Sequence, residues 1–179
     1  VGNYGLSMII NPGPNTTDPD GGTIAPGETK TGSITLADLD AFTFSATNGD
    51  VVTLLMGNDS AAQAGFIPQI ELHAPDGSML VRTAAVLSVT IEALRLTNTG
   101  TYMIICRDSS GSYVGDYGLS LIRNRGPNVT DPDGGIILPG ETKTGSITLA
   151  DLDFFFFEGT NGDIINLRME ETANTEAGF

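Results

Sequence analysis

The chain has 179 residues and a mass of 18.7 kDa, and its 22 acidic and 8 basic residues give a net charge of −14. A chain this acidic lacks the Lys and Arg clusters that bind phosphate, which excludes nucleic acid as a partner and a polybasic membrane patch. Hydrophobic residues make up 40% of the sequence, too many for a disordered acidic tail, and no apolar run approaches the roughly 18 residues of a membrane span.

Alternation of apolar and polar residues with a period of two runs along most of the chain and predicts β-strands. In chain order the predicted strands are residues 30–36, 40–46, 51–56, 68–74, 78–83, 87–94, 100–108 and 117–122. Asn48-Gly49-Asp50 and Pro75-Asp76-Gly77 favour hairpin turns, because Gly, Asn and Asp accept the positive φ of such turns. This spacing of strands and turns predicts an all-β fold, an antiparallel β-sandwich of a jelly-roll-like kind.

The predicted strand at residues 100–108 is apolar on both faces. Tyr102, Ile104 and Cys106 share one face, while Met103 and Ile105 take the other. We therefore expect this strand to be central in its sheet or covered by a partner. Cys106 is expected to be a small buried hydrophobe rather than a reactive thiol.

The sequence repeats itself every 113 residues, so that Val114 corresponds to Val1. Residues 1–66 align without a gap onto residues 114–179, with 44 identities in 66 positions. A period this long suits one small domain per copy, so we predict tandem β-sandwich modules. In this prediction, residues 11–122 form a complete module, residues 1–10 are the last strand of a preceding module or a donated strand, and residues 123–179 begin a second module. Half a sandwich cannot bury its core face, so further chain or a neighbouring subunit would complete it.

A series of landmarks follows in order along residues 30–122. They are Gly32, Asp38 with Asp40, Gly49-Asp50, Pro75-Asp76-Gly77, Gly100-Thr101-Tyr102, and Gly115 with Tyr117. Together they resemble the bacterial pre-peptidase C-terminal domain, and residues 143–179 resemble a second, partial copy of it. The resemblance implies a secreted β-sandwich, often appended to exported proteases or strung in tandem in large surface proteins. We therefore expect an extracellular or cell-surface location.

Two acidic loops, at residues 13–22 and 126–135, are candidate calcium sites, because alternating carboxylates beside glycine supply hard oxygen ligands. The candidate ligands are Asp18, Asp20, Asp131 and Asp133, with Asp38, Asp40, Asp151 and Asp153 added if the fold brings them close. Collagen-binding members of the resembled family bind calcium near their N-terminal segment, so the resemblance implies the same cofactor. The alternative is a linker in which Asp and Asn bond their own backbone in Asx-turns.

The same loops carry candidate glycosylation sites. Asn15 and Asn128 begin equivalent N-x-Thr sequons, and Asn58 begins a third sequon. These sites would make glycans part of the surface.

Two functions remain open. The first is a structural repeat unit of an extracellular fibre, stalk or surface filament, with copies of itself as partners, and the second is a calcium-dependent glycan- or matrix-binding module of a secreted enzyme. We expect no enzymatic activity, because His73 is the only histidine and Cys106 the only cysteine available for a catalytic triad or zinc site. His73 is expected to be a partly packed strand residue.

Overall fold

The computed structural model describes residues 2–11, 13, 15–59, 62–124, 126 and 128–171. Within these residues the regular elements are the strands β1 (Gly22–Thr23), β2 (Glu28–Ile34), β3 (Asp40–Ala46), β4 (Val51–Asn58), β5 (Pro68–His73), β6 (Met79–Ala84), β7 (Ser88–Arg95), β8 (Gly100–Asp108), β9 (Gly115–Asn124), β10 (Gly135–Ile136) and β11 (Phe155–Phe156). The described chain offers no apolar helix of membrane-spanning length. The prediction of an all-β chain is confirmed.

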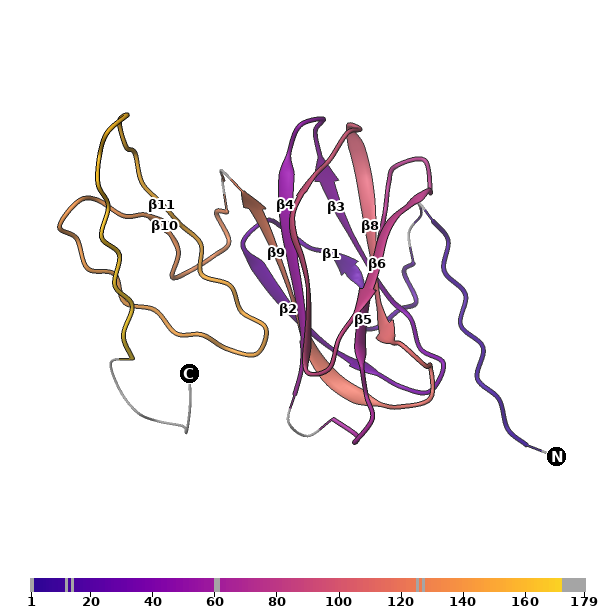
Figure 1. Ribbon diagram of the computed structural model, residues 1–179. Helices are drawn as coiled ribbons and strands as arrows, with labels where there is room; N and C mark the ends of the chain where they lie inside the picture. The colour runs from indigo at the N-terminus through magenta and orange to yellow at the C-terminus, as the bar shows by residue number, and fades with distance from the viewer. Residues whose placement is uncertain are drawn as a thin grey trace.

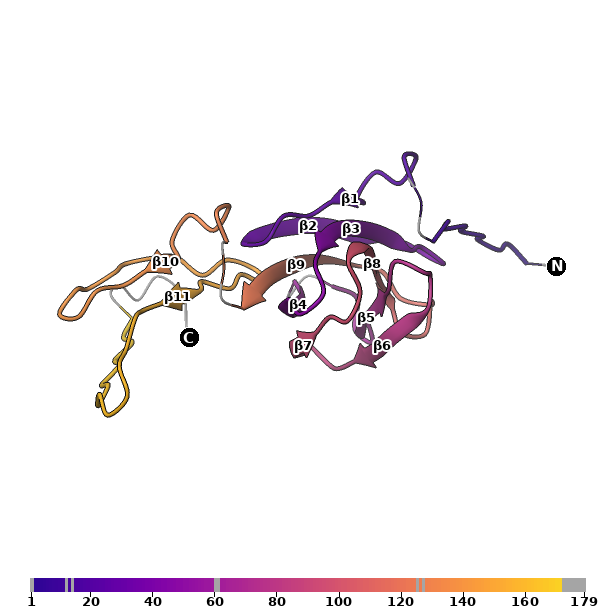
Figure 2. The same cartoon turned by 90° about the horizontal axis from the view of Figure 1, so that it is seen from above.

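Strands β1 to β9 form two sheets that face each other as the layers of one sandwich (Figures 1 and 2). The five-stranded sheet has the order β1-β3-β8-β5-β6, and the four-stranded sheet has the order β2-β9-β4-β7. Period-two alternation places one face of each strand between the sheets. On β4, for example, Val52, Leu54 and Met56 point into the core while the residues between them are half-buried.

The four-stranded sheet is antiparallel, as predicted, whereas the five-stranded sheet is mixed because one of its strand pairs is parallel. The short strand β1 runs parallel to β3, with Gly22 opposite Phe42. β1 and β3 can run parallel because they are not joined by a hairpin. The chain between them passes through β2 in the other sheet and then returns to β3 in the same direction as β1.

β8 is central, between β3 and β5, as its two apolar faces predict. Tyr102 stacks on Phe44 in the main core with a ring-centroid distance of 5.5 Å. On the opposite face, Met103 and Ile105 form a second apolar cluster with Ala41, which Ile9 and Leu39 partly cover. Cys106 is fully buried, and burial raises the pKa of its thiol well above the ordinary value.

The second sequence copy keeps only two short strands in its described part, β10 and β11. Their parallel pairing, with Gly135 opposite Phe155, repeats the pairing of β1 with β3 one period later. Leu167 and Met169 are about three-quarters exposed, whereas the equivalent Leu54 and Met56 are fully buried. β2 and β4 form their strands by pairing with β9 between them, and the second copy has no strand beside residues 141–147 and 164–171 in the part of the chain that the structure describes. The division of the chain into preceding, complete and incomplete modules stays a prediction.

Candidate functional site

Each sequence copy contains the same sharp turn, at residues 35–38 and 148–151. The carboxylate of Asp38 accepts hydrogen bonds from the backbone N–H and the hydroxyl of Thr35, at 3.1 and 2.9 Å. Asp151 accepts the same two bonds from Thr148. The alanine inside each turn, at positions 37 and 150, has a φ of 62° or 56°, so the backbone is left-handed there. The turn presents the carbonyl oxygen of that alanine to the chain that precedes it.

A serine from the preceding strand or segment binds each of these carbonyls, and we call this pairing the serine–turn contact. The hydroxyl of Ser120 on β9 donates to the Ala150 carbonyl at 2.5 Å. The hydroxyl of Ser7 donates to the Ala37 carbonyl at 2.6 Å. Both members of each pair stand one full period from their counterparts, so one contact occurs twice in the chain.

Glycine two residues before each serine permits the close approach. A Cβ added at Gly118 would lie 2.9 Å from the Cβ of Ala150, and one added at Gly5 would lie 3.1 Å from the Cβ of Ala37. Both distances are shorter than ordinary carbon contacts. The sequence Gly-Leu-Ser therefore fits against the turn, where a larger residue in place of glycine would push the two segments apart.

The connection that follows each serine is also repeated. The Asn128 side chain accepts from the backbone N–H of Arg123 at 2.8 Å and donates to its carbonyl at 3.0 Å. Asn15 makes the same two bonds with Ile10, at 2.9 and 3.3 Å. One folded-back connection thus links each strand or segment to the copy that follows it.

Apolar contacts accompany the polar ones. Ile9 packs with Leu39 against the five-stranded sheet, and the equivalent Ile122 is buried on the outer face of the four-stranded sheet. A cavity of about 430 Å³ lies at this second position, lined by Ile122 and by Leu152 and Phe154 of the second copy, with residues of β4 and β7. The junction between the sandwich and the second copy is therefore a packed contact with room left beside it.

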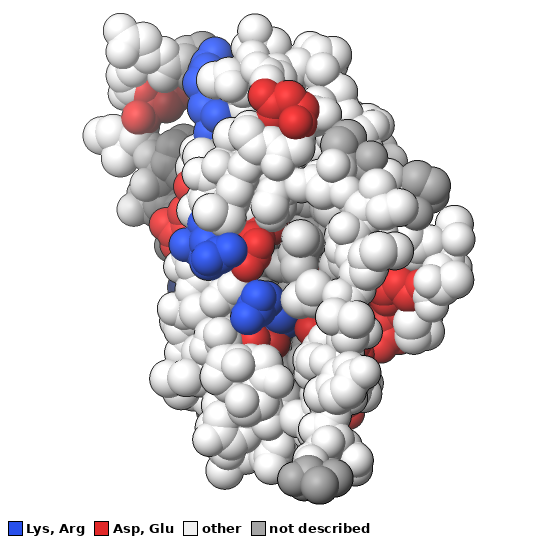
Figure 3. Space-filling model, turned by 90° about the vertical axis from the view of Figure 1, so that its right-hand side faces the viewer, with Lys and Arg blue, Asp and Glu red and all other residues white. Residues whose placement is uncertain are grey.

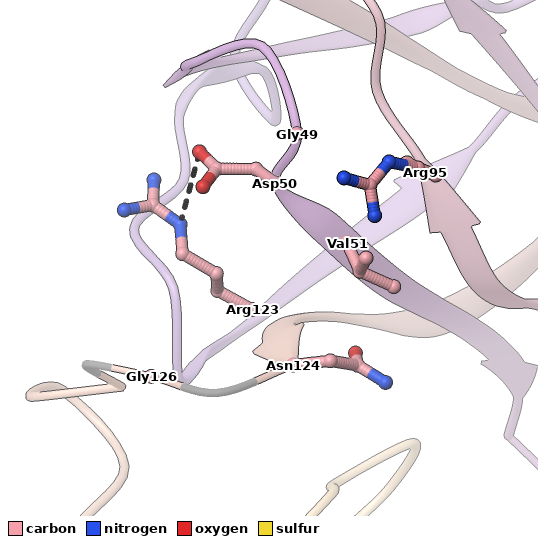
Figure 4. Close-up of a pocket in the computed structure, with 7 residues that line it drawn as sticks. All are labelled: Gly49, Asp50, Val51, Arg95, Arg123, Asn124 and Gly126. Carbon is pink, nitrogen blue, oxygen red and sulfur yellow. Dashed lines mark ion pairs between the residues drawn. The ribbon is translucent and has the colours of Figure 1, made fainter.

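A smaller cavity, of about 250 Å³, lies where β9 ends and the connection begins (Figure 4). Arg123 and Arg95 lie on opposite sides of Asp50 there, and the Arg123 Nε is 3.7 Å from the Asp50 carboxylate. Arg123 also donates to the Ser45 carbonyl at 3.0 Å. These contacts tie the end of β9 to the β3–β4 hairpin. Ile10 stands at the equivalent position of the N-terminal segment, so this ion pair is not repeated.

The face of the molecule on the side of the N-terminal segment is largely uncharged, and its basic groups lie beside acidic ones (Figure 3). Glu71 on β5 is a buried example of such pairing. The Arg82 Nε donates to the Glu71 carboxylate at 2.9 Å, and the His73 Nε2 lies 3.4 Å from the other oxygen of that carboxylate. His73 is half-buried in this cluster, which the sequence did not predict as a group.

The acidic loops fold as Asx-turns that hold the start of each copy. One carboxylate oxygen of Asp18 accepts from the backbone N–H groups of Asp20 and Gly21, and the other accepts from Ala41. Asp131 makes the equivalent three bonds with Asp133, Gly134 and Phe154. Asp20 and Asp133 bond the backbone of Ser33 and Ser146, both at 2.8 Å. Among the described residues, no three acidic, His or Cys side chains are arranged to hold a metal ion, and calcium stays a prediction.

Asp40 joins these loops to the core. Its buried carboxylate accepts a hydrogen bond of 2.6 Å from the Tyr117 hydroxyl of β9. Burial raises the pKa of Asp40 to about 7, and the charges of Asp18, Asp38 and Asp20 add to the rise, while the Tyr117 bond lowers it. Burial likewise raises the pKa of the Tyr117 phenol.

Asp153 holds the equivalent position in the second copy. Its pKa is raised to about 6, first by burial and then by Asp151, Asp131 and Asp133. Within the described part of the chain, no hydrogen-bond donor contacts the Asp153 carboxylate, and no tyrosine lies beside it as Tyr117 lies beside Asp40. The charges of Asp18, Asp20 and Asp38 act on Asp40, and those of Asp131, Asp133 and Asp151 act on Asp153, but within the described residues no three of these carboxylates are arranged to hold a metal ion.

The glycosylation predictions fall on structural side chains. Asn15 and Asn128 are half-buried, and their amides serve the connections described above. Asn58 is also half-buried at the end of β4, and Ser60 of its sequon lies outside the described residues. Glycosylation stays a prediction at all three positions.

Sequence reasoning missed the serine–turn contact. The available signal was that both copies contain Gly-Leu-Ser, at residues 5–7 and 118–120, and Leu-Ala-Asp, at residues 36–38 and 149–151. Sequence identity alone does not indicate that these two motifs touch across the boundary between copies.

No known protein family and no curated protein matches the sequence. Solved structures similar to the chain include PliG of Aeromonas hydrophila, a periplasmic inhibitor of g-type lysozyme, with 16% identity over 58% of this chain and 96% of that chain and a TM-score of 0.45. Another is the pre-peptidase C-terminal domain of collagenase from Bacillus anthracis, with 18% identity, coverage of 56% and 93%, and a TM-score of 0.43. A third is the Yersinia pseudotuberculosis-derived mitogen, with 15% identity, coverage of 58% and 91%, and a TM-score of 0.40. A member of the family that residues 30–122 resemble is thus among these structures.

Proposed function

We propose that the chain is a structural repeat unit of an extracellular fibre, stalk or surface filament, built from tandem β-sandwich modules that follow the period of the sequence repeat. The single observation that carries this proposal is the double occurrence of the serine–turn contact. In the predicted division of the chain, residues 1–10 end a preceding module, so this repeated contact would relate each copy to the next by one rotation and translation. Repetition of one such operation generates a linear array when the rotation does not close a ring.

The chemistry of the contact suits permanent packing rather than exchange of a ligand. Ser120 is buried, and its hydroxyl also lies 2.6 Å from that of Thr29 on β2. The Thr29 hydroxyl also lies 3.0 Å from the Asp151 carboxylate of the second copy, and because Ser120 gives its one hydrogen to Ala150, the one hydrogen of Thr29 is shared between Ser120 and Asp151. This hydrogen-bonded chain connects two strands of the sandwich to the turn of the next copy, and it fixes their orientation.

The proposal assigns no catalytic role to the chain and gives it copies of itself as partners. It also places the protein outside the cell or on its surface, as expected for the resembled family. The net charge of −14 opposes association at low ionic strength, so salt should strengthen the array.

Sedimentation velocity at rising protein concentration tests the proposal. We expect a series of elongated species whose sedimentation coefficients grow slowly with mass, as for linear oligomers. The variant Gly118→Val should disturb the junction between the sandwich and the second copy, whereas Thr101→Val, at an exposed strand position on β8, is a control that also introduces a valine. Globular monomers at all concentrations would count against a fibre.

A second candidate is a calcium-dependent glycan- or matrix-binding module of a secreted enzyme. The favouring observation is the group of carboxylates around Asp40 and around Asp153, whose charges add to the rise in pKa that burial causes in both. A cation bound there would offset this repulsion and stabilise the folded state. The test is the melting temperature with calcium and with excess chelator, and identical melting curves reject this candidate.

A further inference from the structure

The smaller cavity, of about 250 Å³, collects basic side chains in a chain that has 22 acidic and only 8 basic residues. Val51, the first residue of β4, lies in the middle of the lining residues (Figure 4). The strand register places Arg95 of β7 on one side of Val51 and Asn124 of β9 on the other. Asp50 and Arg123 complete a ring of polar side chains around Val51.

Backbone hydrogen bonds hold the walls of this cavity in place. Gly49 donates to the Leu96 carbonyl at 2.8 Å, and the Leu96 N–H donates to the Asp50 carbonyl at 2.7 Å, so the β3–β4 turn is fastened to the end of β7. A Cβ added at Gly49 would lie 3.6 Å from the Arg95 Nη2, which places the guanidinium against this turn. The cavity is therefore formed before any ligand arrives, and a preformed site lowers the entropic cost of binding.

The positive charge in the cavity is not fully compensated. Arg95 is exposed and, among the described residues, is the one basic side chain without a carboxylate partner, whereas ion pairs form at Lys30, Arg82, Arg107, Arg123, Lys143 and Arg168. The pairing of Arg123 is loose, because its Nε lies 3.7 Å from the Asp50 carboxylate and is buried without a hydrogen-bond partner. Two arginines and one aspartate leave the described lining residues with a net charge of 2 − 1 = +1.

Asp50 determines which kind of anion fits. The backbone N–H of Thr47 donates to one oxygen of Asp50 at 2.8 Å, and this bond holds the pKa of Asp50 below its ordinary value, so the carboxylate is ionised at neutral pH. A simple anion such as phosphate would be attracted by the arginines and repelled by Asp50. A ligand with one carboxylate and neighbouring hydroxyl groups suits both, because its hydroxyls donate to Asp50.

We propose that this cavity binds an acidic sugar of the uronic acid class, with the sugar carboxylate on the Arg95 guanidinium and a ring hydroxyl on Asp50. The planar fork of N–H groups on arginine matches the geometry of a carboxylate. One negative charge on the sugar balances the net charge of the lining residues, and Val51 offers an apolar surface to the C–H groups of the ring. The volume is below the roughly 300–1,000 Å³ of sites for drug-sized ligands, so the cavity fits a single ring. This inference goes beyond the proposed function and involves no metal ion.

Saturation-transfer NMR with methyl glucuronide as the probe tests the proposal, because the method observes the ligand and works on single chains and on assemblies. We expect saturable binding of methyl glucuronide, and no binding at the same concentrations of methyl glucoside, which carries a hydroxymethyl group in place of the carboxylate. Arg95→Gln should weaken binding by about tenfold or more, because it removes a charge-assisted hydrogen bond. Arg168→Gln, which removes an exposed arginine that does not line the cavity, should bind like the wild type.

The melting temperature of Arg95→Gln should equal that of the wild type, since Arg95 is exposed and has no carboxylate partner in the described chain. A loss of binding then reports on the site rather than on unfolding. The inference is overturned if methyl glucuronide does not bind saturably, or if Arg95→Gln binds it as tightly as the wild type does. Equal binding of methyl glucoside, or of free glutamate, overturns the assignment to an acidic sugar. None of these results bears on assembly, which sedimentation measures separately.

Discussion

Replacing Asp40 by asparagine should remove a large part of the pH dependence of the sandwich's stability. The Asp40 pKa is about 7 in the folded chain, against an ordinary value of 3.8, so between these limits the folded state holds a proton that the unfolded chain has released. Stability from this group is therefore fully present below about pH 4, falls as the pH rises, and is lost above pH 7. The difference between the two pKa values of Asp40 corresponds to about 4 kcal/mol in the free energy of unfolding.

The variant Asp40→Asn cannot ionise, and its amide oxygen can still accept the Tyr117 hydroxyl. We expect Asp40→Asn to exceed the wild type in stability at pH 8 and to lose this advantage at pH 4. Urea unfolding followed by circular dichroism at a series of pH values measures the difference. Glu92→Gln, on the exposed face of β7, is the control for removing one charge. If the stability curves of Asp40→Asn and wild type stay parallel from pH 4 to 8, the assignment of a raised pKa to Asp40 is refuted.

Three further substitutions test the packing. Leu54→Ala should destabilise the sandwich by about 2–5 kcal/mol because Leu54 is fully buried, whereas Leu167→Ala at the equivalent exposed position should leave the monomer's urea midpoint unchanged. Ala37→Gly should stabilise by about 0.5–1 kcal/mol in thermal unfolding, since glycine accepts the left-handed backbone; a lower melting temperature would argue against strain in that turn. Gly32→Ala should destabilise by about 2–3 kcal/mol, because its Cβ would lie 2.6 Å from the Tyr117 hydroxyl; an unchanged unfolding curve would show that the phenol moves freely.

The sequence predicted the strands well because alternation is a local property. The predicted strands 40–46 and 100–108 coincide with β3 and β8, and 51–56 and 68–74 differ from β4 and β5 by at most two residues. The predicted strand at residues 30–36 lies two residues later than β2, which spans residues 28–34, because the Thr35–Asp38 turn ends β2. The parallel pairing of β1 depends on which sheet each strand joins, and that choice leaves no trace in the local pattern.

The candidate site was predicted only in part, for a related reason. Calcium binding stays a prediction, and the carboxylates of Asp18 and Asp131 each accept hydrogen bonds from three backbone N–H groups. The choice between a calcium loop and an Asx-turn depends on those bonds, which composition does not specify. The serine–turn contact depends on how one copy sits against the next, and only the three-dimensional arrangement brings Ser120 to Ala150.

The central claim is that one junction relates every copy to its neighbour. Electron cryomicroscopy of assemblies of the purified chain tests this most directly, with the polypeptide traced across successive junctions. We predict sandwiches in single file, each related to the next by one operation, with a serine hydroxyl on an alanine carbonyl at every junction. Discrete particles, or junctions that differ from one another and lack this contact, would contradict the account.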